Sequence, residues 1–351
     1  MMITFITSTL TSGGAERVIS LLANEFARKG HAVQMICLTN LKSDYYKLDE
    51  RVSLIHAEDI AGHNLLKRLL WLRKYIVESR TDCVVAFMEA VYEFVLMALL
   101  GTKVPVISSE RKDPSTLGPS RKFLRWILLP TAAAHVVQTK KIKDYYNSYV
   151  KKKTYVIYNP VNEKVFSLPE MEKKDRIISV GRLYEQKNQM MMIDAFNLIK
   201  DKYPSFQLVI FGEGHLRSQL EEHIQKLGLE NRVLLPGRSD KVLEEIKSSK
   251  VFCLSSNYEG MSNAMIEAMC VGTPVISTKV SGTDELIDNG RNGLLVELRD
   301  ADGLARAFDQ LLSDNDLQSV FARRSLSMSS KFKMDTIVGE WEKLIDSVVE
   351  R

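Results

Sequence analysis

The chain has 351 residues, of which 45% are apolar and 26% are charged, with a formal net charge of +4. These totals are typical of a soluble globular protein of two domains. They exclude a membrane-spanning protein, because no apolar run approaches the ~20 residues needed to cross a bilayer. Met1–Leu10 lacks a basic leader and a cleavage site, so we expect a first buried strand there. The four cysteines have no metal-type spacing, which predicts buried thiols in a reducing cytoplasm.

The charge is unevenly distributed along the chain. Residues 1–162 carry 23 Lys and Arg against 14 Asp and Glu, whereas residues 163–351 carry 25 against 30. An asymmetry of this size indicates that the first half faces something anionic. A phospholipid surface, a phosphorylated acceptor and nucleic acid are the candidates.

Short apolar runs alternate with longer amphipathic runs, which predicts a parallel α/β architecture. In the first half we expect strands at Ile3–Thr7, Val33–Leu38, Cys83–Phe87, Val104–Ser108, His135–Thr139 and Tyr155–Tyr158. The expected helices are Ala15–Lys29, Leu65–Glu78, Val91–Leu100, Lys122–Leu129 and Lys141–Tyr149. Asn159-Pro160 marks a break, and the polar segment Glu163–Lys174 is the expected linker.

The alternation resumes after that linker. The expected strands are Ile177–Val180, Gln207–Phe211, Val233–Leu235, Val251–Leu254, Val275–Ser277 and Leu294–Val296. The expected helices include Met190–Lys200, Leu216–Leu227, Val242–Ser248 and Asn263–Val271. The pattern predicts two doubly wound domains, 1–162 and 163–333, each with a ligand crevice at the carboxyl ends of its strands.

Cys253–Thr278 is the most informative segment, with an apolar run, a turn, a helix-forming stretch and a strand. The N–H groups at the start of that helix, a natural seat for phosphate, belong to Met261, Ser262 and Asn263. Glu267 lies about two turns further on, where it could accept hydrogen bonds from both hydroxyls of a ribose. Glu259 lies where we expect the group that is attached to the far end of a diphosphate. These features fit a nucleotide sugar.

The run EGMSNAMIE, residues 259–267, resembles the E-x7-E signature of retaining glycosyltransferases of family 4, which have the GT-B fold. Further matches are Gly181-Arg182-Leu183, Gln186-Lys187-Asn188, Gly212-Glu213-Gly214 and Gly13-Gly14-Ala15-Glu16-Arg17. The chain looks most like bacterial enzymes that extend polyprenyl-diphosphate-linked glycans, and it is N-acetylgalactosaminyltransferase-like. The resemblance implies two Rossmann-like domains facing a central cleft, with helix 334–351 crossing back to the first domain. Its apolar face would consist of Phe332, Ile337, Trp341 and Ile345.

The resemblance also implies roles for individual residues. Arg182 and Lys187 would bind the donor diphosphate, where fixed cations lower the barrier to its departure. Glu267 would bind the ribose, and Glu259 would act on the donor sugar as a positioning and electrostatic residue. Without the motif, Arg182, Lys187 and Glu259 would be interpreted as surface charges. That interpretation is weak for Glu267, because apolar residues surround it in the sequence. The other donor-binding candidates are Gly13, Gly14, Gly212, Gly214, Arg238, Met261, Ser262 and Asn263.

On the acceptor side the chain departs from the family. Many members have a His after the strand that precedes residue 110, whereas this chain has Glu110 and Arg111. Glu110 would either accept a hydrogen bond from the acceptor hydroxyl or pair with Arg111. Both residues are therefore acceptor-side candidates.

The helix expected at Leu65–Glu78 mixes basic and apolar residues on its outer face. Its predicted core stripe is Leu65, Leu69, Leu72 and Ile76. A face of Lys, Leu and Trp suits a membrane interface, with a solvated basic surface as the alternative. The candidates for contact with the membrane or an acceptor diphosphate are Lys67, Arg68, Trp71, Lys74, Arg121, Lys122 and Arg125.

The sequence therefore predicts a retaining transferase that moves an N-acetylhexosamine or a hexose from a UDP-sugar to a lipid-linked saccharide. It would act at the inner face of the plasma membrane. No metal is expected, because Asp300 and Asp314, which begin two D-x-D strings, precede helical runs as ordinary N-caps. A GT-B epimerase or hydrolase and a non-catalytic glycolipid-binding protein are the alternatives. Nucleic acid is not an expected partner, because no aromatic-basic recognition motif is present.

Overall fold

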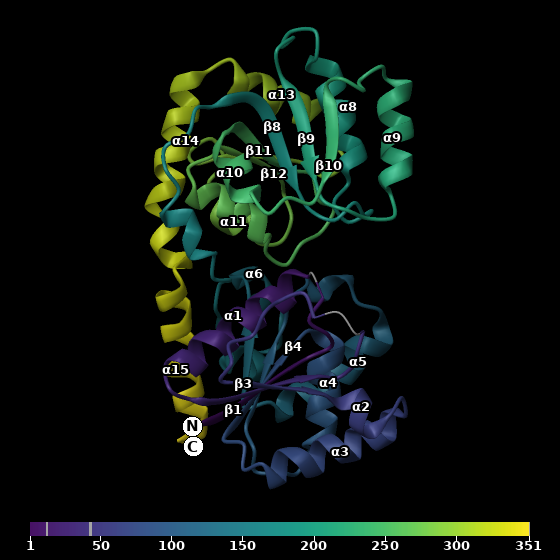
Figure 1. Ribbon diagram of the computed structural model, residues 1–351, viewed down its shortest axis with the longest axis vertical. Coiled ribbons are helices and arrows are strands. Elements are labelled where there is room, and N and C mark those ends of the chain that lie inside the picture. Colours follow the sequence, from purple (N-terminus) through teal and green to yellow (C-terminus); the bar gives the residue numbers. More distant parts are fainter. Residues whose placement is uncertain (12, 42–43, 351) are drawn as a thin grey trace. The chain divides into compact units, whose positions relative to one another are not determined.

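The computed structural model describes residues 1–11, 13–41 and 44–350, which form two compact units. The first unit is Met1–Pro160 with Asp335–Arg351, and the second unit is Val161–Met334 (Figure 1). The expected linker at 163–174 lies inside the second unit, where Glu163–Phe166 forms the 3-10 helix η3. The interpretation of this polar segment as a linker was therefore wrong.

The first unit is built on a parallel sheet with the strand order β3-β2-β1-β4-β5-β6-β7 in the described residues. Its strands are β1 (Met2–Thr7), β2 (Ala32–Cys37), β3 (Val52–His56), β4 (Cys83–Phe87), β5 (Val106–Ser109), β6 (Ala134–Val137) and β7 (Thr154–Val156). The winding direction switches between β1 and β4, as in a doubly wound fold. The sequence analysis missed β3, an edge strand with exposed Ser53 and Leu54, because it has no run of buried residues.

Helices cover both faces of this sheet. They are α1 (Gly14–Arg28), α2 (Ala57–Ala61), α3 (Leu65–Glu78), α4 (Glu89–Ala98), α5 (Pro119–Leu128), α6 (Lys140–Tyr145), α7 (Ser148–Lys152) and α15 (Met334–Val349). The 3-10 helices are η1 (Pro114–Thr116) and η2 (Leu129–Thr131). The single helix predicted at 141–149 is two helices, because the Asn147 side chain accepts hydrogen bonds from the N–H groups of Tyr149 and Val150 and starts α7.

The C-terminal helix α15 belongs to the first unit, as predicted. Its buried face includes Ile337, Trp341 and Ile345. The prediction was wrong for Phe332, which is buried in the 3-10 helix Ser329–Phe332 of the second unit. The Trp341 ring stacks on Phe87 at the end of β4, with 5.8 Å between ring centroids. Burial of such side chains contributes about 1.5–3 kcal/mol each, so α15 is held mainly by this apolar face.

The second unit has a parallel sheet with the order β10-β9-β8-β11-β12-β13 in the described residues. Its strands are β8 (Lys174–Val180), β9 (Gln207–Phe211), β10 (Val233–Gly237), β11 (Ser249–Leu254), β12 (Val275–Thr278) and β13 (Leu294–Val296). Each overlaps a predicted strand, because buried apolar runs mark them clearly. The winding switches between β8 and β11, which places a ligand crevice at their carboxyl ends.

Some of the helices described in the second unit begin with a side-chain N-cap, at Ser262, Asp300 and Asp314. The described helices of this unit are α8 (Gln189–Ile199), α9 (Arg217–Lys226), α10 (Val242–Lys247), α11 (Asn263–Cys270), α12 (Thr283–Leu286), α13 (Ala301–Leu312) and α14 (Asn315–Ser327), with the 3-10 helix η4 (Ser329–Phe332). Asp300 accepts from the Gly303 N–H and Asp314 from the Leu317 N–H, which confirms both as N-caps.

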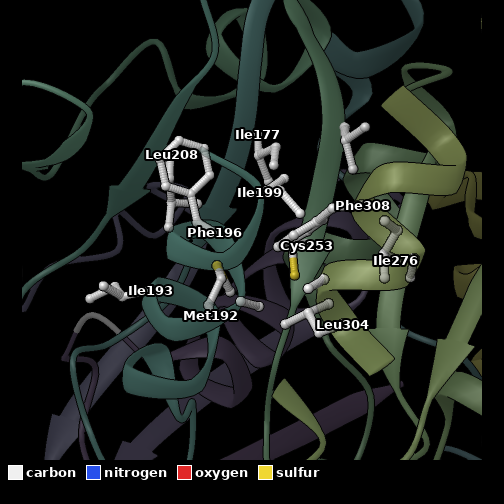
Figure 2. Close-up of a cluster of buried hydrophobic side chains, with 14 of the residues drawn as sticks. Ile177, Met192, Ile193, Phe196, Ile199, Leu208, Cys253, Ile276, Leu304 and Phe308 are labelled. Atoms are coloured by element: carbon white, nitrogen blue, oxygen red, sulfur yellow. The ribbon is translucent and has the colours of Figure 1, made fainter. Parts of the chain in front are cut away.

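The core of the second unit joins α8 and α13 to the sheet. Figure 2 shows Phe196 of α8 and Phe308 of α13 in one cluster with Ile177 and Cys253, and all four are fully buried. The four cysteines are buried as predicted, and burial raises the pKa of Cys37, Cys83 and Cys270 to about 12. No described helix has both the length and the apolar character to cross a bilayer.

Candidate functional site

The carboxyl edge of the second sheet gathers most of the predicted donor-side residues. Arg182 and Lys187 follow β8, and Glu259 follows β11, so they flank the point where the winding switches. Ligands of doubly wound folds bind in the crevice outside this point. The structure therefore places these three residues where a ligand is expected.

Lys187 and Glu259 form an ion pair, with 2.5 Å between Lys187 Nζ and Glu259 Oε1. Ser256 Oγ donates to the same oxygen at 2.8 Å, and Gln186 Nε2 donates to Oε2 at 3.3 Å. Glu259 is only 7% exposed, and a buried carboxylate requires such partners. The sequence analysis did not identify Ser256 and Gln186 as these partners, although both follow strands that end at this edge.

The loop that carries Lys187 is fixed by its backbone. Ser255 Oγ donates to the Lys187 carbonyl at 2.8 Å, and Asn188 adopts a left-handed conformation with φ 47° to start α8. A non-glycine residue in this region is uncommon, and Asn tolerates it best. Lys187 is thereby held toward Glu259, whereas Arg182 is exposed, with its guanidinium 4.9 Å from the Tyr184 ring centroid.

Two predicted glycines allow the strand-end loops to pack closely. Gly212 has φ +140°, and a Cβ there would lie 1.9 Å from the Gly181 carbonyl oxygen. A Cβ on Gly214 would lie 2.3 Å from the Leu183 carbonyl oxygen. These contacts explain both glycines, and their contact with a donor stays a prediction. Arg238 is exposed just after β10.

Helix α11 begins beside Glu259. Ser262 is its N-cap and accepts from the Met265 N–H, and Asn263 is its first residue. The partial positive charge of a helix N-terminus favours an anion there. Glu267 on the same helix is 4% exposed, and with burial it raises the pKa of Cys270 to about 12. Met261 and Ser262 are also buried, so this turn is packed rather than solvated.

The glycine pair of the first unit lies at the start of α1. Gly13 is the N-cap and Gly14 is the first helical residue. Glu16 folds over this end of the helix, so that a Cβ on Gly13 would lie 2.0 Å from Glu16 Oε2. Tyr46 donates its hydroxyl hydrogen to the Gly13 carbonyl at 3.0 Å. Glu16 thus places a carboxylate beside the two glycines that were predicted to bind the donor.

The structure corrects the prediction for Glu110. Its side chain is fully buried and accepts hydrogen bonds from Tyr92 Oη at 2.9 Å, Tyr146 Oη at 2.8 Å and Arg125 Nη1 at 2.8 Å. Burial raises the pKa of Glu110 to about 8, although Arg125 opposes the shift. Neither contact with an acceptor hydroxyl nor pairing with Arg111 fits this arrangement, so both interpretations were wrong.

Arg125 is not at the surface, which corrects its assignment to the membrane. It is 4% exposed, and its Nε donates to Glu93 Oε1 at 2.9 Å. Arg121, one turn earlier, donates to Glu93 Oε2 at 2.7 Å and remains partly exposed. The inner face of α5 therefore carries Arg125 toward buried carboxylates, a pairing that compensates its charge.

Arg111 lies on the opposite face of the first sheet from Glu110. Its guanidinium carbon is 4.0 Å from the Phe87 ring centroid, and Nη1 donates to Asn159 Oδ1 at 2.7 Å. Gln138 Nε2 donates to the same Asn159 oxygen at 2.9 Å. Burial lowers the pKa of Arg111 to about 9.

The outer faces of α3 and α5 carry exposed apolar and basic side chains. Leu65 is 66% exposed, so the predicted core stripe of α3 was wrong at its first residue, whereas Leu72 and Ile76 are buried. On α5, Phe123 and Trp126 are 63% and 65% exposed and stack on each other. The exposed basic residues on these helices are Lys67, Lys74 and Lys122.

Two further candidates have partners within the first unit. Arg68 donates to the carbonyls of Leu38 and His63. Trp71 is partly buried and stacks on Tyr75, with 5.2 Å between ring centroids.

A groove of about 660 Å³ between α6, β7 and α15 contains no predicted site residue, so the switch point remains the better candidate. Within the described ranges, no three His, Cys, Asp or Glu side chains are grouped to hold a metal ion.

Comparison with known proteins gives consistent results for both units. Residues 12–165 match the family described as Glycosyltransferase Family 4, and residues 161–327 match Glycosyl transferases group 1. The chain is 31% identical to a Campylobacter jejuni GalNAc-α-(1→4)-GalNAc-α-(1→3)-diNAcBac-PP-undecaprenol α-1,4-N-acetyl-D-galactosaminyltransferase, covering 99% of both chains.

A second Campylobacter jejuni relative is N-acetylgalactosamine-N,N′-diacetylbacillosaminyl-diphospho-undecaprenol 4-α-N-acetylgalactosaminyltransferase. It is 28% identical over 92% of this chain and 93% of its own. Among solved structures, Anabaena HepE in complex with UDP matches 99% of this chain and 100% of its own, with a TM-score of 0.83 and 19% identity. At that identity the likeness shows the fold alone.

Proposed function

The chain belongs to glycosyltransferase family 4 and has the GT-B fold, and we propose that it transfers a sugar from a UDP-sugar to a polyprenyl-diphosphate-linked saccharide. One observation supports the donor half of this proposal most strongly. The partly buried pair of Lys187 and Glu259 lies at the carboxyl edge of the second sheet, beside the N-terminus of α11. A cation, a helix N-terminus and a fixed carboxylate suit a sugar diphosphate.

The proposed chemistry follows from where charge develops. As the bond between the anomeric carbon and the diphosphate breaks, negative charge grows on the diphosphate and positive charge on the sugar. Lys187 and Arg182 stabilise the negative charge on the diphosphate. Glu259 stabilises the positive charge on the sugar and positions the sugar ring. Glu267 binds the ribose hydroxyls. The positive charges at this edge come from the protein, so the reaction requires no metal ion.

We propose retention of the anomeric configuration. The acceptor oxygen forms its bond to the anomeric carbon on the face from which the diphosphate leaves. The acceptor proton passes to the departing diphosphate, so that the products are the extended saccharide and UDP. Glu259 then does not form a covalent bond to the sugar. This agrees with its Oε1 already accepting hydrogen bonds from Lys187 and Ser256.

The names of the relatives support an N-acetylhexosamine over a hexose as the transferred sugar. Both Campylobacter jejuni relatives are named as N-acetylgalactosaminyltransferases that act on saccharides linked to undecaprenol through a diphosphate. A polyprenyl-diphosphate acceptor also carries the anionic group that the basic first half of the chain predicts.

Such an acceptor lies in a membrane, so we propose that the protein docks on the inner face of the plasma membrane. The exposed Phe123 and Trp126 of α5 lie beside Lys122, and the exposed Leu65 of α3 lies near Lys67. Apolar insertion combined with basic residues suits anionic lipid headgroups.

Purified protein tests the proposal when it is incubated with a panel of UDP-sugars, first alone and then with an undecaprenyl-diphosphate-linked saccharide that contains N-acetylgalactosamine. We expect sugar transfer only when the acceptor is present, unchanged by EDTA, with an α-linkage detected by NMR. Release of free sugar without acceptor would indicate a hydrolase, and a changed sugar nucleotide would indicate an epimerase. Absence of any UDP binding would support a non-catalytic protein.

A further inference from the structure

Several buried polar atoms on one face of the first sheet have no hydrogen-bond partner in the described part of the chain. They are Ser109 Oγ, Arg111 Nε, Arg111 Nη2, Gln138 Oε1 and Trp341 Nε1. Ser109, Gln138 and Trp341 are no more than 2% exposed. Folded proteins satisfy nearly all such groups, so a cluster of them calls for a physical explanation.

These residues belong to one neighbourhood. Ser109 and Arg111 are two residues apart along β5 and its extension, so their side chains lie on the same face of the sheet. Phe87 contacts both the Arg111 guanidinium and the Trp341 ring. Gln138 and Arg111 donate to the same oxygen of Asn159.

The charge of Arg111 makes this neighbourhood unusual. A buried charge without a partner costs several kcal/mol, more than the ~1–3 kcal/mol of a buried neutral donor. Arg125, also at this end of the sheet, donates to the carboxyl groups of Glu93 and Glu110. Glu110 is bound to Arg125 on the opposite face, and no carboxylate in the described residues pairs with Arg111. An anion would supply the missing charge.

The two unpartnered nitrogens also define the kind of anion. Nε and Nη2 lie on the same edge of the guanidinium plane, in the geometry that binds two oxygens of one oxyanion. The Phe87 ring and Asn159 fix that plane. The Ser109 hydroxyl and the Trp341 N–H add donors, so the cluster is rich in donors and poor in acceptors.

We infer that Arg111 binds a diphosphate, holding two of its oxygens through Nε and Nη2, with Ser109 as an additional donor. This inference rests on the proposed function, in which both the UDP-sugar and the lipid-linked acceptor carry a diphosphate. The groups that cover the two nitrogens must move for the diphosphate to reach them.

The matched variants are Arg111→Lys and Arg232→Lys. Lysine keeps the charge but removes the two-donor edge. Arg232 is a suitable control because its guanidinium carbon lies 5.5 Å from the Phe196 ring centroid. Its Nε and Nη2, the same two atoms, donate to the carbonyls of Phe206 and Tyr203, both at 2.7 Å.

Binding is measured with inorganic pyrophosphate, UDP and undecaprenyl diphosphate in detergent micelles. We expect Arg111→Lys to weaken pyrophosphate binding about 10-fold or more, because a charge-assisted pair of hydrogen bonds is lost, and Arg232→Lys to change it less than about 2-fold. If Arg111→Lys also binds undecaprenyl diphosphate more weakly and has a higher KM for the acceptor, the site belongs to the acceptor. If Arg111→Lys instead also binds UDP more weakly, the site belongs to the donor.

Wild-type affinity of folded Arg111→Lys for all three ligands would overturn the inference and leave buried waters as the partners of these atoms. If Arg111→Lys fails to fold, Ser109→Ala decides, with an expected loss of about 3-fold in pyrophosphate affinity and none if the inference is wrong. The wild-type protein tests the proposed function separately. If it binds no UDP, the proposed function is wrong, independently of how the variants behave.

Discussion

The two sheets have the same kind of topology, but their carboxyl edges arrange charge differently. In the second unit, Lys187 and Glu259 pair with each other at the winding switch, where Lys187 is partly exposed and Glu259 is buried. In the first unit, Glu110 is bound to Arg125 of α5. Arg111 lies on the opposite face of the sheet, with no carboxylate partner among the residues that the structure describes. Topology therefore brings charged residues to an edge, but their partners decide which of them a ligand can use.

The largest effect is expected from Lys187→Ala. The change removes a cation from the leaving diphosphate and leaves Glu259 buried without its ionic partner. We expect kcat/KM to fall about 10²–10³-fold, as on loss of one group that stabilises developing charge. Lys202→Ala, at an exposed pair with Asp309, is the control. A loss of less than about threefold at Lys187 would contradict its role in the site.

A smaller effect is expected from Glu267→Ala on donor binding. Loss of a charged acceptor for the ribose hydroxyls should weaken UDP binding about 10-fold to 100-fold in a calorimetric titration. Glu222→Ala, at an exposed helical pair with Lys226, should leave the affinity unchanged. Unchanged affinity in the Glu267 variant would remove its assignment to the ribose and separate α11 from the donor site.

The proposed membrane-docking surface of α5, with the exposed Phe123 and Trp126, is tested by a double variant in which Ser replaces both residues. Each exposed ring would bury apolar surface in a bilayer, so binding to liposomes with anionic lipid should weaken about 10-fold in sedimentation assays. Leu198→Ser, at an exposed position of the second unit, serves as the control. Equal losses in both variants would mean that α5 has no special part in docking.

The smallest effect concerns the pH dependence of stability. In the folded chain Glu110 has a pKa of about 8, above the usual value of 4.5, so the folded state binds more protons between these pH values. Its contribution to the free energy of unfolding is complete below pH 4.5 and is lost as pH rises toward 8. Glu110→Gln should flatten the fall in Tm over this window. An unchanged slope would show that Glu110 is ionised in the folded protein.

Much of the fold could be predicted from the sequence because buried apolar runs mark the strands. All strands of the second unit were found, whereas β3 was missed because an exposed edge strand has no such run. The motifs placed Lys187 and Glu259 at one edge. Their partners Ser256 and Gln186 depend on how two loops meet, which spacing along the chain does not encode.

The acceptor side could not be predicted for a different reason. Charged side chains are expected at the surface, and Lys122 of α5 is there. Arg125, on the same helix, instead points inward because Glu93 compensates its charge and Glu110 accepts a hydrogen bond from it. A buried network of this kind depends on three separate elements, so no local pattern reveals it.

A crystal structure of this protein with UDP tests the central claim most directly. We predict the β-phosphate within hydrogen-bond distance of Lys187 and the N-terminus of α11, with the ribose hydroxyls on Glu267. A nucleotide bound away from the carboxyl ends of β8 and β11 would contradict the proposed site.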